Sequence, residues 1–253
     1  MSLATTYDIH HSCQGDASDF ASLHEVVDRI EAFLRQTLPR IIKEVKGWTP
    51  CKKKRRNEKI MAADLSKELN FAATNEVFYF HPEDPENESA TRTIDWGLYP
   101  NGRLLVQGHS PGAKERLYAI EAKRLPTNEG SIDGREREYV VGDWHGRNLA
   151  NKNLKGGIER LKEGVHGEGL EQAGMVAFVQ RKTASHWLGK VNEWISELVT
   201  NPLKSHTANW DVQDQLTEQA PPGAGITEYK STHNRSDGSA IHLTHFWLDL
   251  TAQ

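Results

Sequence analysis

Residues 116–125 read RLYAIEAKRL, and this run predicts the central feature of the fold, a largely buried β-strand. Within it, Ile120 and Ala122 alternate with Glu121 and Lys123. Successive side chains of a strand point to opposite faces of the sheet. We therefore expect the Glu121 carboxylate and the Lys123 ammonium to project side by side from one face, while apolar side chains cover the other.

The same Glu-x-Lys spacing occurs twice more, at Glu44 and at Glu228. Glu44 lies in a predicted helix, where residues two apart point in different directions and cannot share a site. Glu228 comes late in the chain, and no acidic residue lies on a preceding strand at a suitable distance. The context therefore favours Glu121 over the other two.

The sequence on either side of this strand predicts both helices and strands. Pro39 is expected to kink or split the first helix, and Asn101-Gly102 is the strongest hairpin signal in the chain. The order of elements predicts an α/β fold with a mixed central β-sheet flanked by helices. The predicted helices cover 19–45, 55–69, 149–165 and 187–199, and the predicted strands cover 76–80, 91–98, 104–106, 116–125 and 175–179.

The chain of 253 residues is predicted to form a single domain over 1–253. It would have an N-terminal helical segment at 1–50, a core at 55–200, a flexible loop at 207–225 and a C-terminal β-hairpin at 226–253.

The composition sets limits on the class of protein. With 37% hydrophobic and 26% charged residues it is typical of a globular chain. No apolar run approaches the ~20 residues of a membrane helix, and the N-terminus lacks a signal-peptide pattern. Two cysteines and no CxxC pair disfavour structural zinc and suit a reducing compartment. We expect a cytoplasmic protein without membrane contact.

Histidine is abundant but does not form a recognisable metal motif. There are twelve His residues and no HExxH. His242 and His245 are three apart in a predicted strand, so they should lie on opposite faces. His233 and Arg235 are expected to flank a hairpin tip and to face solvent. Histidine therefore does not predict a metal site here.

Asp95 supplies a second carboxylate near the central strand. It comes after Ile94 in TRTIDWGLYP (91–100), a β-like segment expected to form a hairpin with the strand at 104–106. Two carboxylates that converge from neighbouring strands make a site for Mg²⁺, which prefers oxygen ligands. Beside such an ion, the Lys123 ammonium could orient or deprotonate the attacking water and stabilise developing charge.

Glu58 adds a third acidic group. It lies on the same predicted helix face as the apolar stripe of Met61, Leu65 and Leu69, where a carboxylate is costly unless something pairs with it. Two interpretations stay open: a Glu that points into the site, or a helix-end Glu that reaches solvent.

Together these residues resemble the PD-(D/E)XK nuclease superfamily, whose core is restriction-endonuclease-like. The match consists of a helical Glu (Glu58), an Asp in a hairpin strand (Asp95) and the triplet holding Glu121 and Lys123, and it extends roughly from Arg55 to Val179. The resemblance implies hydrolysis of phosphodiester bonds with Mg²⁺ or Mn²⁺, usually in DNA, by an endonuclease of the restriction or phage-defence kind. It makes Asp95 and Glu121 metal ligands and Lys123 the water-activating residue, with Glu58 completing the site.

Two departures from the family pattern are visible. Ile94 stands where the family often has Pro, and the helix predicted at 149–165 lacks the polar Gln that many relatives carry. Lys155 and Glu159 are the candidates for that polar role.

Nucleic-acid binding requires a local basic region, because the net charge is −4. One unbroken cationic run is present, formed by Lys52, Lys53, Lys54, Arg55 and Arg56. The acidic balance also allows a partner protein or a homo-oligomer to deliver the substrate. The alternative function is a catalytically silent nuclease fold that binds nucleic acid or protein, in which Asp95, Glu121 and Lys123 form only a salt-bridged sheet face.

Overall fold

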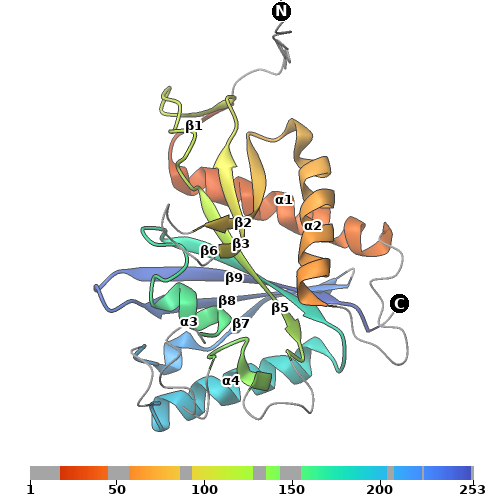
Figure 1. Cartoon of the computed structure of the whole chain (residues 1–253), viewed down its shortest axis with the longest axis vertical. Coiled ribbons are helices and arrows are strands. Elements are labelled where there is room, and N and C mark those ends of the chain that lie inside the picture. Colours follow the sequence, from red (N-terminus) through yellow and green to blue (C-terminus); the bar gives the residue numbers. More distant parts are fainter. Residues whose placement is uncertain are drawn as a thin grey trace, which may run out of the picture.

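The computed structural model describes residues 18–44, 57–85, 93–127, 135–142, 155–203, 208–223 and 225–251. It confirms a mixed α/β fold with a central sheet of seven strands flanked by helices (Figure 1). The helices are α1 (Leu23–Glu44), α2 (Glu58–Ala72), α3 (Gly157–Lys162) and α4 (Ala184–Thr200). The strands are β1 (Ser18–Phe20), β2 (Phe78–Pro85), β3 (Thr93–Pro100), β4 (Leu104–Val106), β5 (Tyr118–Leu125), β6 (Gln172–Val179), β7 (Thr217–Gly223), β8 (Ile226–Asn234) and β9 (Ala240–Asp249).

The sheet has the strand order β2-β3-β5-β6-β9-β8-β7. Its centre is parallel, because β5 pairs with β6 and β6 with β9 in the same direction, and both sides are antiparallel. β5 and β6 are buried along nearly their whole length, as expected of parallel strands covered on both faces. The predicted strand at 116–125 is therefore the third strand of the sheet.

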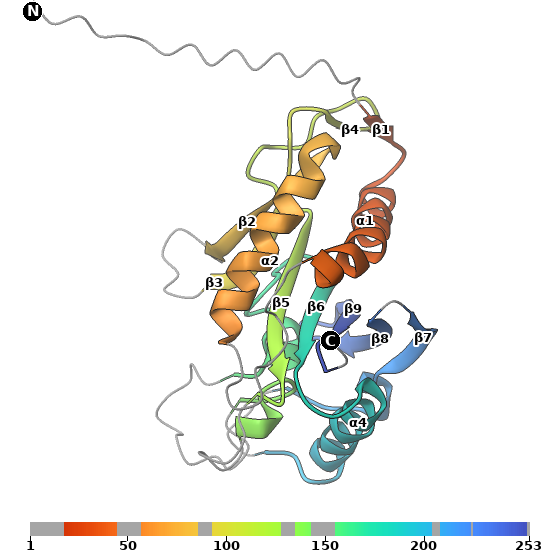
Figure 2. The same ribbon diagram turned by 90° about the vertical axis from the view of Figure 1, so that its right-hand side faces the viewer.

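Two apolar layers hold the helices against the sheet. One contains α1 and α2 with Tyr118, Ile120 and Ala122 of β5. The other contains α3 and α4 with Ala119 and Leu125. The alternation along β5 thus sorts its side chains between the layers, as the sequence predicts. Figure 2 shows the same separation, with α1 and α2 in the upper part of the molecule and α4 below.

Helix α1 differs from expectation at Pro39. The helix continues without a break from Leu23 to Glu44, so the predicted split did not occur. Proline removes one backbone hydrogen bond from a helix interior, but Leu38, Ile41 and Ile42 are buried on both sides of it. Tertiary packing therefore keeps the helix whole.

Three other expectations need correction. The segment 207–225 is not simply a flexible loop, because it holds a 3₁₀ turn (Val212–Asp214) and the edge strand β7. The Asn101-Gly102 turn does not join a hairpin: β4 pairs in parallel with β1, and β3 pairs with β5 instead. The helix expected over 149–165 is only the short α3 within the described residues. Strand pairing decides the first two outcomes, because β7 pairs with the adjacent β8 and β4 pairs with the distant β1.

The C-terminal hairpin is confirmed as β8 and β9, which pair antiparallel from Ile226–Leu248 to Asn234–Ala240. Among the helices that the structure describes, none is long and apolar enough to cross a membrane.

Candidate active site

The site lies where β3 separates from β5. The ladder between these strands runs from Leu98–Tyr118 to Trp96–Ile120. Beyond it, Asp95 Oδ2 accepts a hydrogen bond of 2.7 Å from the backbone N–H of Ala122. A strand edge must satisfy its backbone donors, and here a carboxylate takes the place of the neighbouring strand.

A second carboxylate accepts from the backbone N–H two residues further along β5. Glu58 Oε2 accepts a hydrogen bond of 2.9 Å from the backbone N–H of Arg124. Glu58 is the first residue of α2, whose N-cap is Asn57. Of the two interpretations left open by the sequence, the one in which Glu58 points into the site agrees with this contact.

Glu121 is the buried centre of the site, with 1% of its surface exposed. Its Oε1 accepts hydrogen bonds from Lys123 Nζ at 2.7 Å and from an Arg160 guanidinium nitrogen at 2.9 Å. Its Oε2 lies 3.1 Å from His166 Nδ1. Burial alone would raise the pKa of Glu121, but Lys123, His166 and Arg160 outweigh it and hold the pKa below its ordinary range. Glu121 is therefore ionised at any physiological pH.

The Lys123 ammonium lies among the carboxylates. Besides Glu121, it contacts Glu58 Oε1 at 3.6 Å and the carbonyl oxygen of Ala122 at 3.1 Å. Burial would lower the pKa of Lys123, but Glu121, Glu58 and Asp95 together raise it above the ordinary range for lysine. Lys123 is therefore a permanent cation in this arrangement and has no free lone pair with which to accept a proton.

Asp95, unlike Glu121 and Lys123, is disfavoured in its charged form. It is half-buried, and loss of solvation raises its pKa to about 7, with the neighbouring charge of Glu121 adding to the effect and Lys123 opposing it. A carboxyl in such surroundings is unstable as an anion. A cation that approached Asp95 would relieve this repulsion, so the group is poised to bind positive charge.

The structure thus brings together the four residues predicted to be catalytic: Glu58, Asp95, Glu121 and Lys123. The predicted nucleic-acid-binding run, Lys52 to Arg56, lies outside the described residues.

The two candidates for the polar role expected in the helix at 149–165, Lys155 and Glu159, make contacts of other kinds. Glu159 accepts hydrogen bonds from the backbone N–H groups of Gly156 and Gly142, at 3.0 and 3.2 Å, and so stabilises the start of α3. Lys155 forms an ion pair with Glu163. Arg160 is the α3 residue that reaches Glu121.

Two members of the site, Arg160 and His166, were missed by sequence reasoning. Arg160 lies on a helix of only six residues, too short for a clear periodicity. His166 lies in the turn after that helix. The signal that the sequence offers for His166 is its position between Gly164 and Gly167. In the fold both glycines adopt positive φ, as a tightly constrained turn requires.

His233 and Arg235 do not face solvent as expected. His233 is fully buried, with Nδ1 2.6 Å from Asp214 Oδ1 and Nε2 2.7 Å from the Ser231 hydroxyl. The Arg235 guanidinium donates to the carbonyl oxygens of Leu161, Gly167 and Leu170. Because α3 and the turn after it cover the hairpin, these polar groups connect the two. By contrast, His242 and His245 lie on opposite faces as predicted, exposed and buried respectively.

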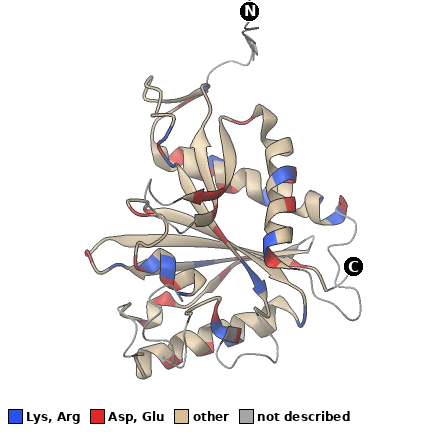
Figure 3. Cartoon of the chain, viewed as in Figure 1, with Lys and Arg blue, Asp and Glu red and all other residues tan. Residues whose placement is uncertain are grey.

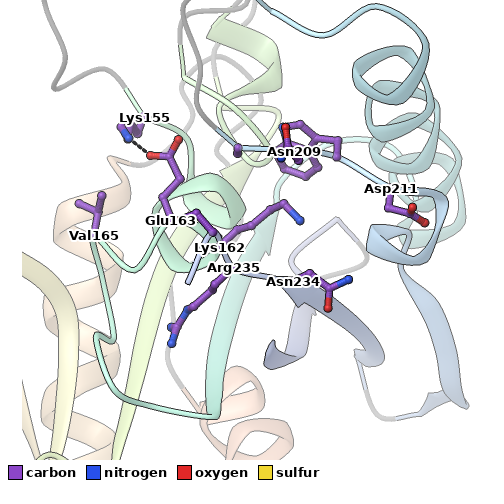
Figure 4. Close-up of a pocket in the computed structure, with 11 residues that line it drawn as sticks. Lys155, Lys162, Glu163, Val165, Asn209, Asp211, Asn234 and Arg235 are labelled. Carbon is purple, nitrogen blue, oxygen red and sulfur yellow. Dashed lines mark ion pairs between the residues drawn. The ribbon is translucent and has the colours of Figure 1, made fainter. Parts of the chain in front are cut away.

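A cavity of about 360 Å³ lies on another side of α3 (Figure 4). Its Lys155 is paired with Glu163. Its Lys162 contacts both carboxylate oxygens of Asp214, at 2.9 and 3.1 Å. Lys162 is two residues after Arg160, so the two side chains leave the helix in different directions. This cavity is separate from the carboxylate site, and its lysines already have acidic partners.

Whether a metal ion could bind here depends on which oxygen atoms of the site are available as ligands. Within the described ranges, no group of three His, Cys, Asp or Glu is arranged to hold an ion. Both oxygens of Glu121 contact cationic or imidazole groups, whereas Asp95 has a raised pKa that a cation would lower. The chemistry fits a hard divalent ion such as Mg²⁺, which takes one or two carboxylates and keeps several waters, provided that a cation now on Glu121 gives way.

In the ribbon of Figure 3, acidic and basic residues are interspersed over both layers of the described chain. This agrees with the net charge of −4.

The chain matches no family model, and it has no match among curated proteins or solved structures. Its function therefore has to be argued from the chemistry of the site itself.

Proposed function

We propose that this chain is a metal-dependent nuclease of the PD-(D/E)XK type that hydrolyses phosphodiester bonds, in DNA rather than RNA. One observation carries the proposal: Asp95, Glu58 and Glu121 converge with Lys123 at the point where β3 leaves β5. Three carboxylates gathered around the buried Lys123 ammonium, with only Arg160 as a further fixed cation among the described residues, form a costly arrangement for a purely structural role. It suits a site that takes up a divalent cation and an anionic substrate.

Asp95 and Glu121 would hold the ion, with Glu58 acting through water. When bound, Mg²⁺ or Mn²⁺ would neutralise phosphate charge and lower the pKa of a coordinated water. The raised pKa of Asp95 means that loading the site releases a proton near neutral pH. Affinity for the ion should therefore increase as the pH rises through 7.

Lys123 would act through its charge. Because its pKa is held above the ordinary lysine range, it orients the attacking water and stabilises the transition state rather than removing a proton. Arg160 is the second fixed cation of the site. Its side chain is 25% exposed, and it could exchange Glu121 for an incoming phosphate, since guanidinium groups bind phosphate in a bidentate manner.

The alternative function, a catalytically silent fold, has one observation in its favour. Glu121 is saturated by Lys123, Arg160 and His166, and an ion can reach it only if one of these moves. A silent protein would keep this network closed in the presence of metal. The two proposals therefore differ in whether divalent ions bind.

The test is cleavage of plasmid, single-stranded DNA and RNA with and without Mg²⁺, together with isothermal titration of Mg²⁺. Glu121→Gln and Lys123→Ala should each abolish cleavage. The matched controls are Glu228→Gln and Lys230→Ala, which alter the same Glu-x-Lys pattern on β8, away from the site; both should cleave normally. A wild-type protein that neither binds the ion nor cleaves any substrate would support the silent fold.

A further inference from the structure

A second cavity lies beside the carboxylate site, over the first turns of α4. Its volume is about 370 Å³, and Pro126, the residue directly after β5, lines it together with residues of α4. The two indoles in its wall, Trp187 and Trp194, belong to the same apolar layer as Leu125 of β5. This is the face from which Lys123 projects. At ~3.3 Å per residue, the step from Lys123 to Pro126 spans roughly 10 Å at most.

The walls of this cavity suit a flat aromatic ligand. The rings of Trp187 and Trp194 lie 6.3 Å apart, and the Arg137 guanidinium lies 5.9 Å from the centre of the Trp194 ring. The two indoles are largely buried, at 7% and 4% exposure, so they form an apolar wall of the cavity. The exposed ring of His186 packs edge-on against Trp187 at 5.2 Å and supplies an accessible stacking face.

The polar groups of the cavity suit a nucleobase better than a phosphate. Glu136 and Glu193 line it, and carboxylates repel phosphate but accept hydrogen bonds from amino groups of bases. Lys182 also lines it and can meet a phosphate beside the base. Lys190 forms an ion pair of 2.7 Å with Glu193, so it can bind a phosphate only by exchanging that carboxylate for it. Lys182 adopts a φ of 62°, a left-handed conformation that is uncommon outside glycine and is often retained at functional sites.

We propose that this cavity binds an unpaired nucleobase of the substrate strand within a few nucleotides of the scissile phosphate. A base stacked in a duplex cannot enter a cavity, so the substrate is single-stranded or locally unpaired at this point. The inference rests on the proposed nuclease function, because it places the cavity on the path of the strand that Lys123 and Asp95 would cleave. Base stacking on aromatic side chains, with cations along the backbone, is the usual mode of binding single strands.

The experiment measures binding in EDTA, where no metal-dependent cleavage occurs. The full-length protein is titrated against a short fluorescein-labelled single-stranded oligodeoxynucleotide, and against the same oligonucleotide with abasic sugars, by fluorescence anisotropy. Wild type should bind the natural strand at least about fivefold more tightly, since one stacked base is worth ~1–3 kcal/mol. An oligoribonucleotide pair of the same design shows whether the cavity distinguishes DNA from RNA.

The decisive variant is His186→Ala/Lys190→Ala, which removes two surface groups of the cavity and leaves both indoles. Its preference for the natural strand should fall below about twofold. The matched control, His242→Ala/Lys230→Ala, removes the same residue types from exposed positions of β9 and β8 and should keep the wild-type preference.

Equal binding of natural and abasic strands by wild type, or binding of neither, would overturn the inference, as would a double variant that discriminates like wild type. Base-dependent binding without cleavage in Mg²⁺ would leave the cavity assigned and refute the nuclease. Cleavage in Mg²⁺ without base-dependent binding would support the nuclease and refute the assignment of the cavity.

Discussion

Asp95→Asn should stabilise the metal-free protein, and by an amount that depends on pH. The Asp95 pKa rises from its ordinary value of 3.8 to about 7 in the folded protein. The folded state therefore holds a proton that the unfolded state releases between these values. Stability must fall as the pH rises through this window, and the cost is complete above pH 7 and absent below about pH 4.

The size of the effect comes from the pKa difference. A difference of about 3 in pKa corresponds to roughly 4 kcal/mol, because each pKa unit is worth ~1.4 kcal/mol. This is a ceiling, since Asp95 retains some contact with solvent and surface exposure screens its interaction with Glu121. Asn keeps an oxygen for the Ala122 N–H. We expect a gain of ~1–2 kcal/mol in the free energy of unfolding at pH 8, and almost none at pH 4.

The measurement is urea denaturation of wild type and Asp95→Asn at pH 4, 6 and 8 in EDTA. Asp64→Asn is the control: it changes a partly exposed acid of α2 that forms an ion pair of 3.6 Å with Lys67, and it should show little difference at any pH. Saturating Mg²⁺ should stabilise wild type, by ~2.7 kcal/mol at a hundredfold excess over Kd, and leave Asp95→Asn unchanged. An Asn variant that is less stable at pH 8, or whose advantage is the same at pH 4, would refute this account of the site.

Further substitutions test the ion pairs around Glu121 and the packing that holds α3 in place. Lys123→Met leaves the buried Glu121 with one fewer cation, and urea denaturation should show a loss of ~3 kcal/mol; a loss below about 1 kcal/mol would mean that Arg160 and His166 alone neutralise the carboxylate. Gly156→Ala would place a Cβ 2.4 Å from the backbone nitrogen of Val141, which cannot move away as a side chain can. We expect it to lower the thermal midpoint, with a cost of ~1–3 kcal/mol, and to reduce cleavage by displacing Arg160. Gly189→Ala on α4 meets nothing within 4 Å and should instead stabilise by ~0.5–1 kcal/mol; equal effects of the two substitutions would show that α3 is not held by this close approach.

Much of the sheet was predictable from local pattern. Alternation along β5 placed Glu121 and Lys123 on one face and Ile120 and Ala122 on the other, because the pleat of a strand imposes that order whatever surrounds it. The same reasoning located the strand of Asp95 and the helix of Glu58. A carboxylate on an apolar stripe must find a partner, and Glu58 accepts from the Arg124 N–H.

The rest depended on contacts between distant segments, which no local pattern contains. Periodicity shows which face a residue occupies, but only packing showed that Arg160 and His166 reach Glu121. Pro39 remained within a continuous helix because buried neighbours hold both sides of it. His233 became buried because α3 and Asp214 cover the end of the hairpin.

The charge states of the site likewise arise from the folded arrangement. Local pattern established that an acid and a lysine share a face of β5. Whether that lysine is a base or a permanent cation depends on how many carboxylates surround it and how little water remains. In this fold Glu121, Glu58 and Asp95 keep Lys123 charged, and burial raises the pKa of Asp95 to about 7, because the interaction between charges depends on distance and solvent exposure, which only the folded chain defines.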